Sequence, residues 1–462
     1  MTPPDTRLHA RPRARLRARL RSRLDNAPGA TVLRRWPGNL LKPIRLGAFW
    51  LVASLLPVLL LACGGGGGSG VAGVGSGGTG AFSLGTITGF GSVIVNGKRF
   101  DDSNAAVSDD DGPRSRADLK LGMVVKVQGS MAVTASTSTS LSTSVSTSTL
   151  AGTATATATA SSVMFDSALL GPVTRIDVAS RTLVVLGQQV ALPAVAVLGA
   201  SLPLGLASIQ PGQVVEVHGF LNAATGVLQA SLIERLGSAS PPAYFKLSGQ
   251  IANLQGSAKT LQIGPINPIS ISYANLPASS LPSPLANGVV VKIRLLPQTP
   301  LPGGDWTATR LTLVGGDAPH ANTDGDRAEV EGLISAVSSA TQFSVGGVRV
   351  DARNARAPDG SASIVAGARA EVKGVFAGGT LAATDVEIKQ ALVKDIELHG
   401  TVSGLDVVAQ TLVVRGSVVN YAAAQLDGGS ASQLANGVRL EVRGKVAPDS
   451  PQVNASRIRF DN

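Results

Sequence analysis

The chain has few of the residues on which most recognisable sites depend. Its 462 residues include one cysteine, Cys63, and four histidines, and aromatic residues make up only 3%. One cysteine excludes an internal disulfide and a cysteine-based metal site, and the four scattered histidines disfavour a histidine site. We therefore predict no metal site and no cofactor. The scarcity of aromatic residues also argues against recognition of carbohydrates or single-stranded nucleic acids by stacking.

Charged residues are scarce too, at 15%, and the formal net charge of +10 is unevenly distributed. Residues 1–62 contain 12 Lys and Arg but only two acidic residues, so the rest of the chain is formally neutral. A strongly basic protein normally suggests nucleic acid as a partner. Here the excess charge lies in a segment that looks removable, and we expect no nucleic-acid partner.

That segment has the features of a leader. An uncharged stretch, residues 46–62, follows Arg45 and precedes Cys63. A basic flank, a short apolar stretch and a small residue before a cleavage point are typical of a secretory signal. The stretch is also shorter than the about 20 residues that a membrane-spanning helix needs. Residues 60–63, Leu-Leu-Ala-Cys, resemble the bacterial lipobox, which implies cleavage before Cys63 and lipid attachment to it. The alternative is an uncleaved anchor helix with an incidental cysteine.

The lipobox resemblance implies a lipid-anchored protein of the cell envelope, with the membrane as a partner through Cys63. Gly64 after the cysteine favours the outer membrane. Arginine alternates with other residues from Arg11 to Arg23, far beyond an ordinary basic flank. This pattern indicates either a nucleic-acid-binding arm or a translation start further along, near Val32, and we favour the start. Residues 63–80 form a glycine-rich tether with a mean reach of about 20–25 Å.

Internal repetition is the strongest signal in the sequence. One eight-residue pattern occurs five times, beginning at Gly122, Gly212, Gly288, Gly367 and Gly437. Its fourth and sixth places are always apolar, its fifth always charged and its seventh always polar, which predicts a half-buried strand. The fifth places carry either sign, so we expect them on a solvated face: Lys126, Glu216, Lys292, Glu371 and Glu441. The third copy ends in Leu295 where the others have glycine, and its strand should end differently.

Shorter patterns before and after each copy define five units. They cover residues 81–166, 169–236, 244–315, 328–389 and 395–462. Each unit offers about five short strands with glycine turns and no convincing amphipathic helix. We predict an all-β fold of five tandem, small, OB-like β-barrels of about 70 residues, since closure removes exposed strand edges. A barrel that small is marginally stable alone, so neighbours should pack together. The alternative, one large transmembrane barrel, needs longer strands and aromatic girdles.

Two stretches resemble a known family. Residues 89–112 with 118–129 in the first unit, and residues 330–352 in the fourth, are similar to the domain of unknown function numbered 5666. That family occurs as tandem units in bacterial secreted proteins and lipoproteins. The resemblance covers most of residues 84–462 and is weakest in the third unit. Because the family has no assigned activity, it implies fold and location only.

The sequence contains no evident catalytic set. His218, His320 and His399 stand at unrelated positions of the repeats, which favours surface histidines over a shared site. Asp109, Asp110 and Asp111 form an acidic loop and are a candidate Ca²⁺ site, although their spacing favours a solvated turn.

We therefore predict a binding or structural role in the envelope and no enzyme, with an envelope protein or polymer of unknown identity as partner. The alternative is an enzyme or accessory factor for envelope polymers, which would need clustered acidic residues from one unit in a cleft.

The Ser/Thr-rich residues 131–165 interrupt the first unit. In other units the same interval is a short hairpin turn, so this insertion lengthens a hairpin. Threonine favours extended backbone, and we predict a two-stranded arm that turns near Ala151 and Gly152. The alternative is a disordered linker.

Overall fold

The structure is a computed structural model. It describes residues 80–131, 158–237, 242–264, 268–298, 304–314, 324–356, 364–389 and 395–461. Over these residues the chain is all-β, with strands and a few 3₁₀ turns, which confirms the predicted fold class. Within the same ranges no helix is long and apolar enough to span a membrane. The leader with Cys63, the tether, His320 and the arm from residue 132 to 157 lie outside the described residues.

The first barrel is made by residues 80–165 and is called barrel 1. It contains β1 (Gly80–Phe90), β2 (Val93–Val95), β3 (Lys98–Asp101), β4 (Ala106–Asp109), β5 (Gly112–Arg114), a 3₁₀ turn (Arg116–Asp118), β6 (Val124–Met131) and β7 (Ala158–Phe165). The pairings run β1–β2–β3–β7–β6 and return to β1, so the sheet closes. β3 and β7 are parallel and the other pairs in this circuit are antiparallel. Five strands closed in this Greek-key order form an OB-like barrel.

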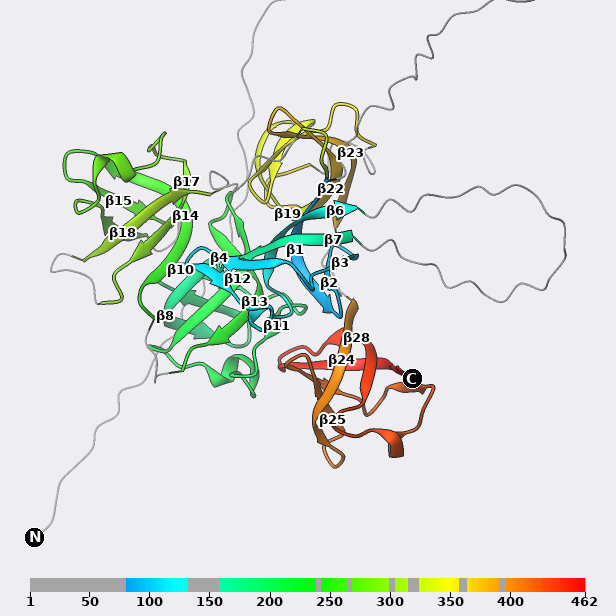
Figure 1. The fold of residues 1–462 in the computed structure, drawn as a ribbon. Coiled ribbons are helices and arrows are strands. Elements are labelled where there is room, and N and C mark those ends of the chain that lie inside the picture. The colour runs from blue at the N-terminus through cyan, green and yellow to red at the C-terminus, as the bar shows by residue number, and fades with distance from the viewer. Residues whose placement is uncertain are drawn as a thin grey trace, which may run out of the picture. The chain divides into compact units, whose positions relative to one another are not determined.

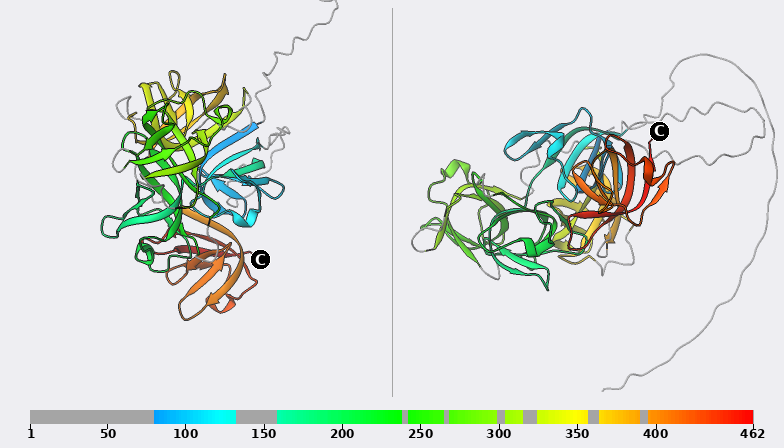
Figure 2. Two further views of the ribbon diagram at one scale, coloured as in Figure 1. Left: turned by 90° about the vertical axis from the view of Figure 1, so that its left-hand side faces the viewer. Right: turned by 90° about the horizontal axis from the view of Figure 1, so that it is seen from below.

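The same circuit recurs along the rest of the described chain (Figures 1 and 2). Barrel 2 has β8 (Leu169–Asp177), β9 (Thr182–Val185), β10 (Gln188–Ala191), β11 (Val197–Leu198), β12 (Val214–Asn222) and β13 (Val227–Arg235). Barrel 3 has β14 (Phe245–Gln255), β15 (Thr260–Ile263), β16 (Ile269–Ser272), β17 (Val290–Leu295) and β18 (Asp305–Leu313). Barrel 4 has β19 (Arg327–Ser339), β20 (Gln342–Val345), β21 (Val348–Asp351), β22 (Arg369–Ala377) and β23 (Thr380–Lys389).

Barrel 5 has β24 (Asp395–Asp406), β25 (Thr411–Val414), β26 (Ser417–Asn420), β27 (Gln425–Asp427), β28 (Arg439–Val446) and β29 (Gln452–Phe460). Further 3₁₀ turns are Gly205–Ser208, Ala278–Ser280 and Ala431–Gln433. In each barrel the third strand of the circuit runs parallel to the strand that comes last in the chain, such as β3 to β7 in barrel 1. The prediction of small closed barrels is therefore confirmed.

The eight-residue pattern lies on the strand that closes each circuit by pairing with its first strand: β6, β12, β17, β22 and β28. Its fourth and sixth places point into the barrel, as in Val125 and Val127, which are buried. The fifth places are half-buried in four copies, but Glu441 is only 5% exposed. The expectation of a solvated face is wrong for Glu441, because Arg443 and Arg459 bind its carboxylate and cover it.

The eighth place lies at a β-bulge in every copy, and glycine occupies it in four of the five. The register of the hairpin shifts there, for example between Gln128 and Gly129. A side chain at Gly129 would lie 1.9 Å from the carbonyl oxygen of Thr159, so only glycine fits. In the third copy β17 ends at Leu295 itself, whereas the other four strands continue for two or three residues. The predicted difference in strand ending is confirmed.

The barrels also share strand edges and cores. Residues 81–84 of β1 pair in parallel with residues 327–330 of β19, and Gly89 and Phe90 pair with β24. In the same way β14 meets β8 at Lys246 and Leu170. One hydrophobic cluster joins barrels 1 and 5, and another joins barrels 2 and 3. These contacts cover edges that a lone barrel would expose.

The Ser/Thr-rich insertion interrupts a hairpin, as predicted from its position. The pairing of β6 with β7 continues to Met131 and Ala158, so residues 132–157 connect the two paired strands directly. The arm itself, with its turn near Ala151 and Gly152, stays a prediction.

Candidate binding site at the acidic loop and the adjoining cavity

The acidic loop lies in the tight turn between β4 and β5. The carboxylate of Asp109 accepts hydrogen bonds from the backbone N–H groups of Asp111 (2.8 Å) and Gly112 (3.1 Å). It also binds Nε of Arg114 at 2.6 Å. Asp109 therefore fixes the shape of the turn and leaves the next two carboxylates to point outward.

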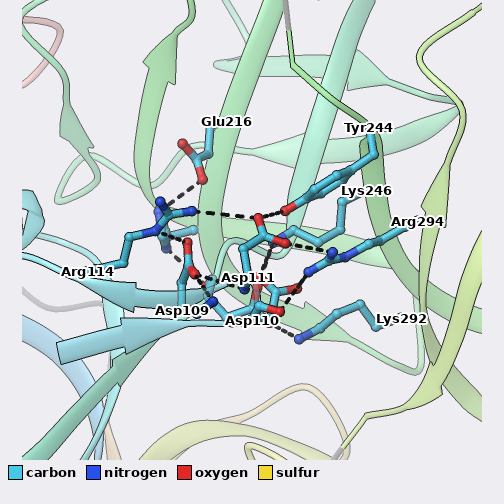
Figure 3. A network of polar contacts seen from close by, with 12 residues as sticks. Asp109, Asp110, Asp111, Arg114, Glu216, Tyr244, Lys246, Lys292 and Arg294 are labelled. Atoms are coloured by element: carbon cyan, nitrogen blue, oxygen red, sulfur yellow. Dashed lines mark hydrogen bonds and ion pairs between the residues drawn. The ribbon is translucent and has the colours of Figure 1, made fainter. Parts of the chain in front are cut away.

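Those two carboxylates bind cationic side chains of barrel 3 (Figure 3). The guanidinium group of Arg294 lies 2.9 Å from Asp110 Oδ2 and 2.6 Å from Asp111 Oδ1. Lys246 Nζ lies 3.4 Å from Asp110 Oδ1, and the hydroxyl of Tyr244 donates to Asp111. Arg294 also stacks over the Tyr244 ring, 4.2 Å from its centroid. The loop is thus a contact between two barrels, and the expectation of a solvated turn is wrong.

Electrostatics in this contact favour the ionised carboxylate. Burial opposes ionisation of Asp110, but Lys246 and Arg294 outweigh it, and the pKa of Asp110 is lowered. Burial in turn lowers the pKa of Lys246, against the attraction of Asp110. Burial, followed by the hydrogen bond to Asp111, raises the pKa of Tyr244. Asp110 is therefore held as an anion whose charge is compensated by protein cations.

The candidate Ca²⁺ ligands do come together. One oxygen from each of Asp109, Asp110 and Asp111 lies within 4.8 Å of the others. Oxygen clusters of this kind suit Ca²⁺. Here Arg114, Arg294 and Lys246 already supply positive charge to the same oxygens, so a metal ion would compete with them. The Ca²⁺ site stays an untested candidate.

A second set of polar residues continues this network behind the loop. Asp166, between β7 and β8, binds Lys246 Nζ at 2.6 Å and also binds Lys292. Its carbonyl oxygen lies 3.1 Å from Nδ1 of His218, which is fully buried. Nε2 of His218 lacks a hydrogen-bond partner among the described residues; Glu216 Oε1 is 3.9 Å away. The network therefore links barrels 1, 2 and 3.

The prediction that His218 lies on the surface is wrong. The segment at Asp166 and the strand that carries Lys246 cover this seventh place of the pattern. Burial, followed by repulsion from Lys246, lowers the pKa of His218 to about 3. The imidazole is therefore neutral at physiological pH, and it adds no charge to the site.

A cavity of about 670 Å³ adjoins the network and is lined by barrels 1, 2, 3 and 4. This volume falls in the range of about 300–1,000 Å³ that is usual for ligand sites. Most of the wall is apolar, and it includes Leu84, Val124, Met164, Phe220, Val290 and Leu333. The charged lining residues are Asp110, Lys126, Asp166, Lys292 and Arg310. Asp110, Asp166 and Lys292 thus belong both to the network and to the cavity.

Two equivalent strands contribute the same pair of side chains to this wall. β6 presents Val124 and Lys126, and β17 presents Val290 and Lys292, from the third and fifth places of the pattern. These places face outward, where valine has no packing role inside its own barrel. Sequence reasoning missed this wall. The available signal was that the third place is valine in the first three copies but arginine in the last two, at Arg369 and Arg439.

A separate cluster of polar residues in barrel 5 contains His399. His399 Nε2 lies 2.7 Å from Glu397 Oε1 and 3.8 Å from Glu441 Oε1. The hydrogen bond from His399, with help from Arg99, lowers the pKa of Glu397 to about 2. The side chain of His399 is half-buried, with 22% of its surface exposed. These residues include metal-ligating types within 4.8 Å of one another, but Arg99 and Arg443 already bind the carboxylates.

Tandem, closed, OB-like barrels of this kind fit a non-catalytic binding or structural role. The family described as a domain of unknown function, DUF5666, matches residues 171–234, 331–387 and 399–459. These three regions lie in barrels 2, 4 and 5 and are consistent with tandem copies of that domain. The resemblance noted at residues 330–352 falls almost wholly within a match, whereas residues 89–129 lie outside the matched regions. No curated protein and no solved structure matches the chain.

Proposed function

We propose that the chain is a secreted, lipid-anchored protein of the cell envelope whose barrels bind a ligand or partner. The observation that carries the binding role is the cavity of about 670 Å³ to which four barrels contribute. A purely structural role would need only the strand pairings and ion pairs that hold the barrels together. Several barrels that together surround one largely apolar cavity supply what ligand recognition needs.

The surrounding contacts support a preformed site. Asp110 and Asp111 bind Arg294, while Asp166 binds Lys246, so barrels 1 and 3 are held together beside the cavity. The barrels are rigid scaffolds because each sheet closes on itself and the remaining edges pair with neighbouring barrels. A ligand would therefore meet a wall whose shape is set in advance, which lowers the entropic cost of binding.

The runner-up, an enzyme that acts on envelope polymers, has one observation in its favour, since Asp110 lies in an acidic cluster and lines the cavity. A general acid, however, works best with a pKa near the operating pH. The pKa of Asp110 is lowered by Lys246 and Arg294, and its oxygens are committed to ion pairs. These properties favour binding over acid–base chemistry at this position.

Lipid attachment is tested by metabolic labelling with radioactive palmitate. We expect label in the wild-type chain and none in Cys63→Ala, because the thiol of Cys63 is the attachment point implied by the lipobox. Label that survives the substitution would contradict the anchor.

The binding role is tested by placing a photo-crosslinking amino acid at Arg310, which is exposed and lines the cavity. We expect crosslinks to envelope material from this position. The matched control is the same amino acid at Lys259, which is exposed on barrel 3 but does not line the cavity. Equal yields from the two positions would contradict a role for the cavity.

No nucleic acid is expected among the partners. Without residues 1–62 the chain has no excess of cations, so binding would release few counterions from phosphates. A chain that starts at Gly64 should show no micromolar affinity for single-stranded DNA or RNA at physiological salt in a filter-binding assay. Micromolar binding would contradict this expectation.

A further inference from the structure

The charge around the cavity is biased toward cations. Its lining holds three cationic side chains and two carboxylates, Asp110 and Asp166. Both carboxylates also contact Lys246, a buried cation behind the wall, at 3.4 Å and 2.6 Å. Asp110 has a further ion pair with Arg294. Asp166 also binds Lys292, which itself lines the cavity. Five cations, three in the lining and two behind it, therefore surround two lining carboxylates, and the balance of charge is positive.

The apolar part of the wall is mainly aliphatic. Valine and leucine side chains predominate, beside two phenylalanines and one methionine. The Val-x-Lys pairs of β6 and β17 place a valine and a lysine two residues apart on one face of each strand. An aliphatic chain is stabilised by each methylene that such a wall removes from water. Sugars or bases would instead need polar walls or stacking aromatics.

We infer that this cavity binds an amphipathic anion with one aliphatic chain, such as a free fatty acid or an anionic lysophospholipid. The chain would lie against Val124, Val290 and Leu333, and the anionic head would lie at Arg310 and Lys126, since Lys292 already binds Asp166. This inference rests on the proposed binding role and names the class of ligand. Free fatty acids and lysophospholipids both have one aliphatic chain and an anionic head, and they differ in the chemistry of the head group.

The inference is tested by isothermal titration calorimetry on a chain that starts at Gly64. That chain retains every described strand and core residue, since these begin at Gly80 and Ala81. The probes are dodecanoate and lauroyl lysophosphatidylglycerol, each below its micellar concentration. Dodecyltrimethylammonium, with the same chain and a cationic head, is the control probe. We expect saturable binding of at least one anionic probe, at least tenfold tighter than that of the cationic probe.

Ser335→Trp fills the cavity from the wall of β19. We expect it to weaken binding of the anionic probe at least tenfold. The matched control is Ser338→Trp, because Ser338 is exposed on the same strand and does not line the cavity. Circular dichroism and thermal melting establish that both variants are folded. The double variant Lys126→Met with Arg310→Met should weaken the anionic probes severalfold, whereas Lys259→Met should not.

Any one of three results would overturn the inference. The first is that neither anionic probe binds, and the second is that the cationic probe binds equally well. The third is that Ser335→Trp and Ser338→Trp bind the anionic probe equally. Tighter binding of dodecanoate identifies fatty acids as the source, and tighter binding of the lysophospholipid identifies membrane lipids. If both probes fail while crosslinks at Arg310 and palmitate labelling succeed, the proposed function stands and only this ligand class is rejected.

Discussion

Strands β17 and β28 occupy the same place in two barrels and use their outward side chains in different ways. On β17, Lys292 binds Asp166 and Arg294 binds Asp110, so both partners belong to the chain before barrel 3. On β28, Glu441 binds Arg443 beside it, and it also binds Arg459 on the neighbouring strand of the same barrel. One strand joins barrels, and the other stabilises its own face.

One repeat pattern can therefore support two kinds of contact at the barrel surface. The inward places must be apolar in every copy because they fill a small core. The outward places are under no such constraint. Their side chains differ between barrels and bind the residues that lie next to each barrel. The outward face of β17 therefore has the wall and the ion pairs of a shared site, while that of β28 has a local network.

The largest expected effect concerns the eighth place, where β28 has Gly444 and β17 has Leu295. A side chain at Gly444 would lie 2.3 Å from the carbonyl oxygen of Asn454. We expect Gly444→Leu to destabilise barrel 5 by about 3 kcal/mol or more, since the backbone must shift to admit it. Hydrogen exchange followed by mass spectrometry should show the loss in peptides of residues 395–461. The matched control, Leu295→Met, should have little effect on barrel 3, and equal protection in the two variants would contradict the role of the bulge.

The next effect compares the seventh places, Arg294 and Arg443. Arg294→Met leaves Asp110 and Asp111 without their main cation in a largely buried contact, and we expect a loss of about 2 kcal/mol. Arg443 is 55% exposed, so Arg443→Met should cost at most about 1 kcal/mol. Urea denaturation measures both losses. Faster hydrogen exchange in residues 109–114 should accompany the first variant alone. A larger loss for Arg443→Met would reverse the comparison.

A third test uses pH and the seventh place of β12, His218. Its pKa is about 3 in the folded chain, below about 6.5 for an unfolded histidine. As the pH falls below 6.5 the unfolded chain takes up the proton first, so the free energy of unfolding falls. The limiting slope is about 1.4 kcal/mol per pH unit. His218→Gln should remove this slope between pH 6.5 and 5 in urea titrations, and an unchanged slope would show that another group is responsible.

The smallest effect is expected for Arg457, whose partner Asp427 lies on the surface of barrel 5. Exposed ion pairs contribute little because water and salt screen them. Arg457→Ala should leave the urea midpoint unchanged within experimental error. A clear loss of stability would mean that the face of β28 and β29 is more tightly coupled than its exposure indicates.

The all-β class and the closed barrels could be predicted because period-two alternation and glycine turns are local signals. The burial of Val125 and Val127 follows from that alternation. Close approach of the backbone explains why glycine recurs at the eighth place in four copies. Such local signals do not predict the contacts between barrels.

The candidate site could not be predicted in the same way. Asp110 and Arg294 are 184 residues apart in sequence, and nothing near either one identifies the other. His218 was expected on the surface because its place is polar in every copy. Its burial depends on Asp166 and Lys246, which come from outside β12. Repeats predict the fold of each unit, whereas contacts between units depend on residues that differ from copy to copy.

The parallel pairing of β1 with β19 bears on how such a gene can change. Tandem duplication usually leaves the number of copies open, because each copy can be gained or lost with its own linker. Here Ala81 in the first copy is paired with Arg327 in the fourth, and loss of either copy would leave a strand edge without its neighbour. Removing the first or the fourth copy would therefore alter a barrel that is distant from it in sequence.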